Sequence, residues 1–421
     1  MMKRIIGMAL LAGLFAVSMM SGATPAMAAD DPNGLLVYIN WSSNAEIGAV
    51  NQIKTRFVER GGIWSDFTIA HDTGASVALI NMITGGNPPD VFILANQRER
   101  REYLKRGLIN DFTEYYKTMN IDDKLPKAVK DAVAVDGIVT SAPLAVHIDA
   151  TLFYNKQVAA DCGIDPTVWK SLDDMFNDFD KIKAKGYIPL AIGGQKWQIG
   201  YLFHAMAAHV SGELYDSVWS YQPKREALSS PEMRELLAVM RRIQQNTDEG
   251  SPNRNWNDTT NLVITGKALM QIHGDWMKGE FIAAGKKIGE DYDSMIVPGS
   301  KGVVVTIDEW SFLAPKTEAK AKAQNLLFDV VYDKDTQIAF SSIKGCTPAR
   351  LDAAEGVDKH AKMVLDILKD PTFQHANPHI GSDEDWNNAI WDIVDVYWNT
   401  PNMSADEAIK QLEAQYDLIF E

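Results

Sequence analysis

The segment that most constrains the fold runs T-G-G-N-P-P-D-V-F-I-L from Thr84 to Leu94. Its glycine pair can end a helix, because glycine accepts the positive φ of a helix C-cap, and two prolines cannot extend that helix. The run Val91 to Leu94 is β-prone and continuously apolar, which is typical of a strand covered on both faces. In α/β sheets, ligands usually bind where such strands end. The segment is either a plain helix-to-strand turn or the approach to a ligand loop.

The segments around this turn alternate between strand and helix patterns. Strand patterns cover residues 34–39, 67–70 and 91–94, and helical spacing of apolar residues covers 49–58 and 76–83. This order predicts a βαβ arrangement with a mainly parallel sheet. A chain of 421 residues is long enough for two domains, or for two lobes of one architecture.

The alternation continues to the end of the chain. Asp136-Gly137 predicts a hairpin turn within residues 132–143. Residues 98–106 form a charged helical segment, and we expect its arginines to face solvent. The other predicted strands are 150–154, 188–192, 268–272 and 303–307, and the other predicted helices are 169–182, 201–217, 232–246, 256–265, 319–333, 335–341 and most of 361–421.

The first 28 residues have the pattern of a secretion signal. Lys3 and Arg4 precede an apolar run over residues 5–20, and Ala26-Met27-Ala28 fits a cleavage site. No later segment reaches the roughly 20 apolar residues of a membrane-spanning helix. We therefore expect an exported protein that resides in the periplasm.

Charge and cysteine content exclude several classes. The chain has 41 Lys and Arg against 56 Asp and Glu, a net charge of −15, which argues against nucleic acid or anionic lipid as a partner. Cys162 and Cys346 are its two cysteines, and their pairing is left open. Neither they nor the scattered histidines have the spacing of a metal site, so no metal is expected.

Several predicted strands end in aromatic rings beside carboxylates, amides or a histidine. A carbohydrate needs this mixture, because its C–H faces lie on aromatic planes and its hydroxyls need fixed donors and acceptors. Each tryptophan taken alone is better explained as a core residue. The pairs are Trp41 with Glu46, Asn96 with Gln97, Trp197 with Gln198, Asp275 with Trp276, and Asp308 with Glu309.

An enzyme is the alternative of another class. Glu46 and Asp308 are conceivable as the acid and nucleophile of a secreted glycoside hydrolase. The motifs G-x-S-x-G, H-E-x-x-H, G-x-G-x-x-G and the P-loop are absent from the sequence. A binding protein without chemistry of its own is the favoured hypothesis.

Three motifs follow the predicted signal: T-G-G-N-P-P-D-V, G-K-A-L-M-Q-I-H-G-D-W and S-S-I-K-G-C-T-P-A-R. In this order they resemble the extracellular solute-binding proteins of family 1, which deliver sugars to ABC importers. The resemblance extends over nearly all of the mature chain. Within it, G-D-W-M-K-G at residues 274–279 resembles the glucose/mannose-binding branch.

The resemblance implies a periplasmic-binding-protein-like (type II) fold, with two α/β lobes, a hinge and a ligand cleft between the lobes. The first lobe would comprise residues 29–145 and 290–343, and the second 146–289 and 344–421. The implied function is capture of a sugar, most simply a monosaccharide such as a hexose, with no catalysis and no cofactor. The implied protein is a monomer that delivers its sugar to permease subunits in the inner membrane, and the sugar favours the closed form.

The resemblance also implies sugar-binding residues. It assigns stacking rings and polar contacts to Trp41, Glu46, Trp256, Trp276, Asp308, Lys344 and His379. Positions at strand ends add Asn96, Gln97, His147 and Trp197 to the predicted site. For His147 and Trp197 a structural role is an equal alternative.

Three departures from the glucose branch lie near the site. Ser42 stands where that branch has a second tryptophan. Ile93 and Ala95 stand where it has a glutamine and a histidine, and Asn96 and Gln97 are displaced along the loop. A hydrogen-bonded site discriminates against ligands that leave its polar groups unpaired, so glucose itself is in doubt.

Two other ligands are therefore kept as alternatives, an oligosaccharide and an acidic sugar. Arg98, Arg100 and Arg101 would favour an acidic ligand if they turned inward. A solvated helix face is the interpretation we prefer for these arginines.

Overall fold

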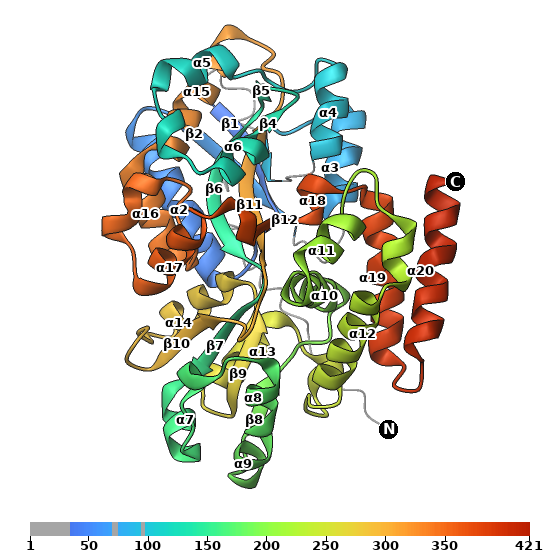
Figure 1. Cartoon of the computed structure of the whole chain (residues 1–421). Coiled ribbons are helices and arrows are strands. Elements are labelled where there is room, and N and C mark those ends of the chain that lie inside the picture. The colour runs from blue at the N-terminus through green and yellow to red at the C-terminus, as the bar shows by residue number, and fades with distance from the viewer. Residues whose placement is uncertain (1–33, 70–74, 94–96) are drawn as a thin grey trace, which may run out of the picture.

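The computed structural model of the chain describes residues 34–69, 75–93 and 97–421, and the predicted signal lies outside them. Two separate main sheets lie one above the other in Figure 1, each with helices around it. In the part of the chain that the structure describes, no helix is long and apolar enough to cross a bilayer.

The first sheet has six strands in the order β12-β11-β3-β1-β2, with β6 paired to β11. β1 pairs in parallel with β2 and β3, whereas β11 runs antiparallel to β3 and β6. The predicted parallel βαβ arrangement is therefore confirmed for the first three strands. The bounds are β1 Gly34–Ile39, β2 Ile63–Thr68, β3 Val91–Ile93, β6 Ser141–Ile148, β11 Val303–Phe312 and β12 Gln374–Ala376.

The two helices of this βαβ arrangement are α2 (Asn44–Glu59) and α3 (Ala75–Thr84). The turn after α3 follows the prediction, since Gly86 has a φ of +79° and β3 begins at Val91. α2 begins five residues earlier than predicted because Ser43 and Glu46 form a capping box, which satisfies backbone N–H groups at its first turn.

The second sheet has four strands in the order β10-β7-β9-β8. The strands predicted near residues 150–154, 188–192 and 268–272 are confirmed, while β10 was not predicted because Y-D-S-M-I has no clear strand pattern. The bounds are β7 Thr151–Asn155, β8 Ile188–Ala191, β9 Ala268–His273 and β10 Tyr292–Ile296.

Helices surround both sheets. Near the first sheet lie α4 Gln97–Lys105, α5 Thr113–Met119, α6 Lys127–Val133, α15 Glu318–Tyr332, α16 Lys334–Lys344 and α17 Lys359–Ile367, with the predicted hairpin as β4 Ala134–Val135 and β5 Ile138–Val139. The others are α7 Lys156–Cys162, α8 Leu172–Asn177, α9 Phe179–Ala184, α10 Lys196–Val210, α11 Gly212–Val218, α12 Pro231–Gln244, α13 Trp256–Ile264, α14 Lys278–Ala283, α18 Pro378–Gly381, α19 Glu384–Asn399 and α20 Ala405–Phe420. Two predicted helices are thus each split in two, into α8 with α9 and into α10 with α11, the latter where Ser211 caps α11.

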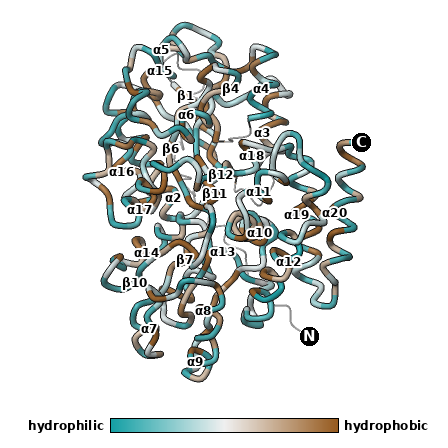
Figure 2. Tube along the Cα trace, viewed as in Figure 1, coloured by the Kyte–Doolittle hydropathy of each residue, from teal (hydrophilic) through white to brown (hydrophobic). Residues whose placement is uncertain are grey.

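Each sheet has its own apolar core. Figure 2 shows the apolar segments gathered along the strands and on the inward faces of the helices. One core packs Val37, Ile307 and Phe328 around the first sheet, and the other packs Leu190 and Phe203 with helices beside the second. Burying one such side chain contributes about 1.5–3 kcal/mol. Each sheet is therefore stabilised by its own large cluster of buried apolar side chains.

The strand pairing shifts the expected lobe limits. β10 pairs with β7, so the chain returns to the first sheet at β11 rather than at residue 290. β12 pairs with β11, and α17 packs into the first core, although both were expected in the second lobe. The local sequence does not predict these pairings, because the partner of a strand is determined by the tertiary structure.

The charged helix α4 corrects a second expectation. Arg100 is fully buried rather than solvated, and its Nη2 lies 2.7 Å from Glu309 Oε1. Its guanidinium also donates to Ser141 Oγ at 2.5 Å and to the carbonyl of Ala132 at 2.6 Å. Arg100 and Glu309 lie far apart in the sequence, so the residues around Arg100 do not reveal their ion pair and predict only a polar helix.

Both cysteines are free thiols. Cys162 ends α7 beside the second sheet, whereas Cys346 is buried near Ser341, with 3.4 Å between Sγ and Oγ. Burial raises the pKa of Cys346 to about 12, which keeps it an unreactive thiol. The two do not pair in this structure.

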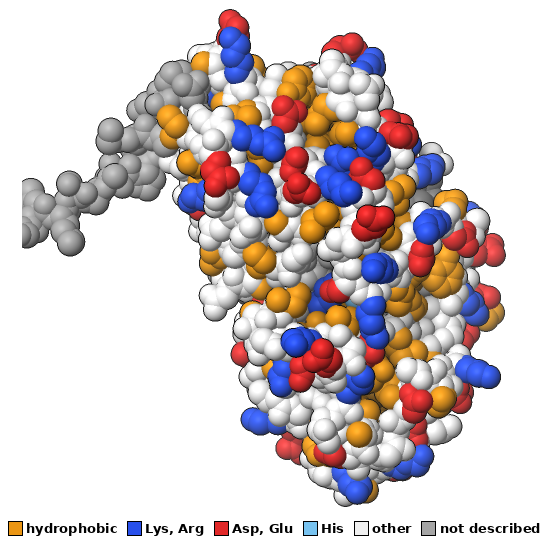
Figure 3. All heavy atoms as spheres, turned by 90° about the vertical axis from the view of Figure 1, so that its left-hand side faces the viewer, with side chains coloured by type: hydrophobic (Ala, Val, Ile, Leu, Met, Phe, Trp, Pro, Cys, Tyr) orange, Lys and Arg blue, Asp and Glu red, His pale blue; other side chains and the backbone are white. Residues whose placement is uncertain are grey.

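The surface is charged but mixed. Figure 3 shows acidic and basic side chains interspersed over one face, with small apolar patches between them. In this view the left edge of the molecule steps inward between its upper and lower parts. The face shown has no extended field of one sign.

Candidate ligand-binding site

A cavity of about 730 Å³ lies between the ends of the two sheets. This volume is within the range usual for small-molecule sites. Its walls come from the loop after β1, from β6 and β11, and from the N-termini of α10 and α13. Residues far apart in the sequence thus meet at one place.

Nine of the eleven predicted site residues line this cavity. They arrive from both sheets and from the C-terminal helices. They are Trp41, Glu46, His147, Trp197, Trp256, Trp276, Asp308, Lys344 and His379.

The other two predicted residues do not contribute to the described cavity. Asn96 lies outside the described residues. Gln97 begins α4 and is buried, and its amide donates to the carbonyls of Asp131 at 2.6 Å and Ala132 at 3.4 Å. The prediction for Gln97 is wrong because its side chain fixes the end of α6 instead of facing the cavity.

One side of the cavity, here called the aromatic side, consists of Trp197, Tyr201, Trp256 and Trp276. The ring centroids of Trp197 and Trp276 are 6.3 Å apart, and Tyr201 meets Trp276 edge-on at 5.7 Å. Trp276 Nε1 donates to His273 Nε2 at 3.1 Å, which fixes the orientation of its ring. These residues extend from elements around the second sheet, and their rings give a stiff apolar surface.

A second group of lining residues, here called the polar side, consists of Glu46, His147, Asp308 and Lys344. His147 is the second-last residue of β6, and Asp308 lies beside a bulge in the paired strand β11, so that His147 Nε2 is 2.9 Å from Asp308 Oδ2. Burial opposes the charged form of His147, but Asp275 and Asp308 outweigh it and raise the pKa of His147 to about 9. The imidazolium, with Lys344, keeps the pKa of Asp308 below its usual range.

Glu46 and Lys344 form the second ion pair of the polar side. Lys344 Nζ donates to Glu46 Oε1 at 3.0 Å and also lies 4.3 Å from the centre of the Trp41 ring. The Glu46 carboxylate accepts from the backbone N–H groups of Ser42 and Ser43 at 3.1 and 2.9 Å. Burial alone would raise the pKa of Glu46, but Lys344 and these donors lower it.

Two positions in the motifs around the site, Gly274 and Gly345, have no room for a side chain. A Cβ on Gly274 would lie 2.1 Å from the Trp276 ring, so the G-D-W motif lets that ring fold back over the backbone. Gly345, at a φ of +83°, has Gly279 N within 2.3 Å of the position a Cβ would take. This close approach packs α14 against the end of α16 and places Lys344.

Behind the cavity, the buried carboxyl group of Asp149 is hydrogen-bonded to two other segments of the chain. Asp149, between β6 and β7, accepts from Thr306 Oγ1 at 2.5 Å and from Asn377 Nδ2 at 3.0 Å. Burial raises the pKa of Asp149 to about 7. Thr306 and Asn377 line the cavity, so they connect the ligand space to the segments that join the two sheets.

The cavity continues toward α18 and α19. His379 Nδ1 lies 3.1 Å from Glu384 Oε2, and Trp391 Nε1 donates to His204 Nε2 at 2.9 Å. Of this end, sequence reasoning predicted His379 but missed Trp391, which lies in an amphipathic helix and looks like core. The lining residues that were not predicted include Asn40, Glu99, Gln195, Tyr201, Asn255, Asn257, Thr306, Asn377, Glu384, Asn388 and Trp391.

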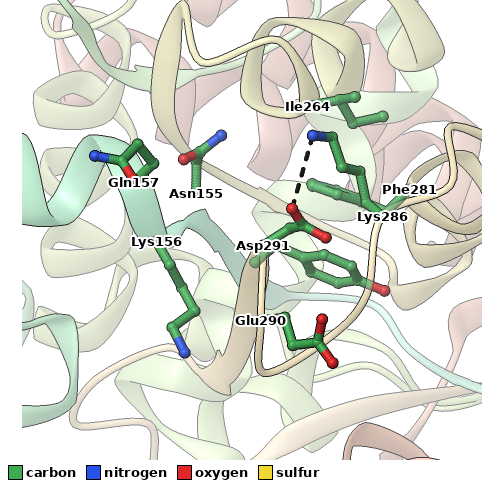
Figure 4. Close-up of a pocket in the computed structure, with 9 residues that line it drawn as sticks. Asn155, Lys156, Gln157, Ile264, Phe281, Lys286, Glu290 and Asp291 are labelled. Atoms are coloured by element: carbon green, nitrogen blue, oxygen red, sulfur yellow. Dashed lines mark ion pairs between the residues drawn. The ribbon is translucent and has the colours of Figure 1, made fainter.

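A second cavity of about 210 Å³ lies beside the second sheet. Figure 4 shows its charged lining, in which Lys286 faces Asp291 with 3.8 Å between Nζ and Oδ1. Lys156 Nζ bonds to the carbonyl of Gly289. These partners hold the charges in place, and the lining contains two aromatic rings, Phe281 and Tyr292, but none of the tryptophans that line the 730 Å³ cavity. Within residues 34–69, 75–93 and 97–421 no cluster of His, Cys, Asp or Glu is arranged to hold a metal ion.

Comparison with known proteins adds the family. The sequence profile of the bacterial extracellular solute-binding proteins matches residues 67–338. The chain belongs to this family. The family comprises solute-binding proteins and is not an enzyme class, and the predicted family membership is confirmed.

Similar curated proteins match over almost the whole length. A "probable sugar-binding periplasmic protein" of Mesorhizobium japonicum is 30% identical over 386 residues, covering 90% of this chain and 92% of the relative. One with the same description from Brucella suis is 28% identical over 417 residues, covering 96% of each chain.

Solved structures share the fold. The bacterial solute receptor AcbH, described as having an exclusive preference for β-D-galactopyranose, matches with a TM-score of 0.78 at 17% identity, covering 92% of this chain and 99% of the receptor. A chitin oligosaccharide binding protein matches with a TM-score of 0.77 at 15% identity, covering 91% and 98%. The predicted two-lobed, type II periplasmic-binding fold is thereby confirmed. The assignment to the glucose/mannose branch stays a prediction.

Proposed function

We propose that the protein captures a neutral sugar in the cavity between its two lobes and delivers it to an ABC importer from the periplasm. The observation that carries this proposal is the meeting of an aromatic side and a polar side in one cavity. A pyranose ring presents C–H faces to the first and hydroxyls to the second. The descriptions of the similar curated proteins as sugar-binding and periplasmic support it.

The charges of the cavity favour a neutral ligand over an acidic one. Its cationic side chains are already matched by carboxylates, Lys344 by Glu46 and His147 by Asp308. None of the described residues that line the cavity is an arginine. Arg98 pairs with Asp383, so the basic helix α4 does not supply a counter-ion for an acidic sugar. A carboxylate on the ligand would therefore lie near anions without a cation of its own.

The ion pairs of the polar side also disfavour the glycoside hydrolase alternative. A hydrolase needs one of its two carboxyl groups protonated near neutral pH, to act as the acid. Glu46 and Asp308 both have a lowered pKa, the first through Lys344 and backbone donors and the second through His147. Two carboxylates held in the ionised form suit hydroxyl binding rather than acid catalysis.

Ligand length is the finer part of the proposal. The polar side concentrates its hydroxyl-binding groups beside Trp276, which suits one sugar unit, and we propose a monosaccharide such as a hexose. An oligosaccharide is the alternative, since the cavity extends to His379, Glu384 and Trp391. Comparing a monosaccharide with its own disaccharide and trisaccharide separates the two, because a longer ligand would gain affinity from the extension.

Titration calorimetry with hexoses, pentoses, uronates and short oligosaccharides tests the proposal, together with a mass spectrum of any sugar that co-purifies. We expect saturable binding of a neutral sugar, closure of the lobes seen as a smaller radius of gyration, and a monomer throughout. Lack of binding to every carbohydrate would refute the proposal. Tight binding of a uronate alone would refute the neutral class.

A further inference from the structure

A chain of hydrogen-bonded polar groups, buried at its centre, leads from the cavity into the contact between the two lobes. His147 Nδ1 is 2.5 Å from Asp275 Oδ1, while its Nε2 is 2.9 Å from Asp308. Asp275 Oδ2 is 3.1 Å from His360 Nε2, and Ser294 Oγ is 2.9 Å from His360 Nδ1. The series Asp308, His147, Asp275, His360 and Ser294, here called the relay, is continuous.

The relay crosses between the sheets. His147 and Asp308 belong to β6 and β11 of the first sheet, and Ser294 belongs to β10 of the second. Asp275 follows β9 and opens the short 3₁₀ turn η6, Asp275–Met277, whose next residue is Trp276 of the aromatic side. One turn therefore supplies both a ring that faces the ligand and the carboxylate at the centre of the relay.

The hydrogen-bond partners determine which ring nitrogens of His147 and His360 carry hydrogen. His147 has a carboxylate at each ring nitrogen, so it bonds to both only when both nitrogens carry hydrogen and the ring is cationic. Asp275 is completely buried, and in this arrangement it accepts one hydrogen bond from His147 and one from His360. Burial lowers the pKa of His360, so that ring is neutral and accepts from Ser294. Asp308 keeps 21% of its side chain exposed, and it lines the cavity.

We propose that Asp275 and His360, neither of which lines the cavity, are positioning residues that hold His147 as a cation and thereby fix Asp308 as an ionised acceptor for a ligand hydroxyl. The affinity part of this inference rests on the proposed sugar-binding function. Asp275 comes from the second-sheet side, whereas His147 and Asp308 belong to the first sheet, so the position of the acceptor depends on a contact between the two sides. Ligand recognition and lobe contact are then coupled through one carboxylate.

Asp275→Asn is the decisive variant, since it keeps the shape and removes the charge that stabilises the His147 cation. The titratable groups outside the relay that face it are Asp149, Glu309, Lys344, Cys346, Lys278 and Asp358. The wild-type protein should bind its sugar equally well between pH 5.5 and 8. The variant should bind about tenfold more weakly at pH 8 and recover to near the wild-type affinity at pH 5.5.

The matched control is Lys359→Ala. Lys359 is adjacent to His360 on α17 and also bridges to the second sheet, through Asp293, but it is exposed and outside the relay. We expect no change in affinity for it, a loss for His360→Leu, and a smaller loss for His360→Gln, which keeps a donor. A pH-independent loss in Asp275→Asn, or an equal loss in Lys359→Ala, would overturn the positioning role.

Nitrogen NMR of labelled histidine in the ligand-free protein separates this inference from the proposed function. With the His147 signals assigned by their loss in His147→Gln, both nitrogens should be protonated at pH 7.5 in the wild type and not in Asp275→Asn. A neutral His147 in the wild type would overturn the inference. Absence of sugar binding by the wild type would instead overturn the proposed function, and the NMR result would still decide whether Asp275 holds the cation.

Discussion

The aromatic and polar sides of the cavity are built in different ways. On the aromatic side, neighbouring rings orient one another, as Tyr201 and Trp276 do at 5.7 Å, and the contacts carry no charge. On the polar side, ion pairs orient each group, with Lys344 on Glu46 and His147 on Asp308. Apolar contact scales with area and tolerates small changes, whereas a buried ion pair is costly to break by removing one partner. The two sides should therefore respond differently to substitution and to pH.

Asp308→Ala should have the largest effect of the substitutions that compare the two sides. It removes a hydroxyl acceptor and leaves the buried His147 cation with one carboxylate instead of two. Truncating one member of such a pair costs about 2–5 kcal/mol, so affinity should fall by roughly thirtyfold to a few thousandfold. Calorimetry measures this fall, and Asp308→Asn, which keeps an acceptor, should lose less. Unchanged affinity in Asp308→Ala would remove Asp308 from the site.

The polar side should also make stability depend on pH. The pKa of His147 is raised to about 9 from an ordinary value of 6.5, so its contribution is complete below pH 6.5 and is lost as pH rises to 9. Such a difference corresponds to about 3 kcal/mol. The raised pKa values of Asp149 and Glu309, each about 7, act mainly below pH 7 and do not mask it.

Urea unfolding at pH 6.5, 7.5 and 9 measures this loss, and His147→Gln is its control. The glutamine does not titrate, so stability of the variant should fall less than that of the wild type over the same interval. Parallel pH profiles for the two proteins would show that His147 is not held as a cation.

Trp276→Ala is the corresponding test of the aromatic side. Loss of the ring removes a stacking surface and its edge-on contact with His147, whose centroid lies 5.3 Å away. We expect a loss of about 2 kcal/mol, or roughly thirtyfold in affinity. Trp276→Phe should retain most of the binding. Unlike the effects of the polar side, this loss should be the same at pH 6 and pH 8, and a strong pH dependence would contradict the comparison.

The part of the fold that sequence predicted is the part encoded locally. The run Val91 to Ile93 and the turn at Asp136-Gly137 carry their own signals, and both form as predicted. The predicted strand ends at Trp41, Trp276 and Asp308 carry residues that line the cavity. The capping pattern Ser43-x-x-Glu46 was also visible in the sequence and would have placed the start of α2 correctly.

The rest depended on long-range contacts. Arg100 looked solvated because its partner Glu309 lies on a strand far along the chain. Gln97 looked like a ligand contact, but its amide bonds to backbone that arrives from α6. Asn377 was missed because no strand end was predicted beside it, and Trp391 because its spacing in an amphipathic helix resembles that of a core residue. In each case the deciding partner is supplied by tertiary packing rather than by adjacent residues.

Arg98→Ala should have the smallest effect, because it belongs to neither side. Arg98 Nη1 lies 2.6 Å from Asp383 Oδ2 and so links α4 to the residue that caps α19, near the edge of the cavity. Its side chain is 48% exposed, and pairs of this kind contribute about 0–1 kcal/mol and are screened by salt. Affinity should therefore change less than about fivefold at low salt and not measurably at 0.5 M NaCl. A larger loss that persists in high salt would mean that this exposed pair, and not only the buried relay, sets the balance between the open and closed forms.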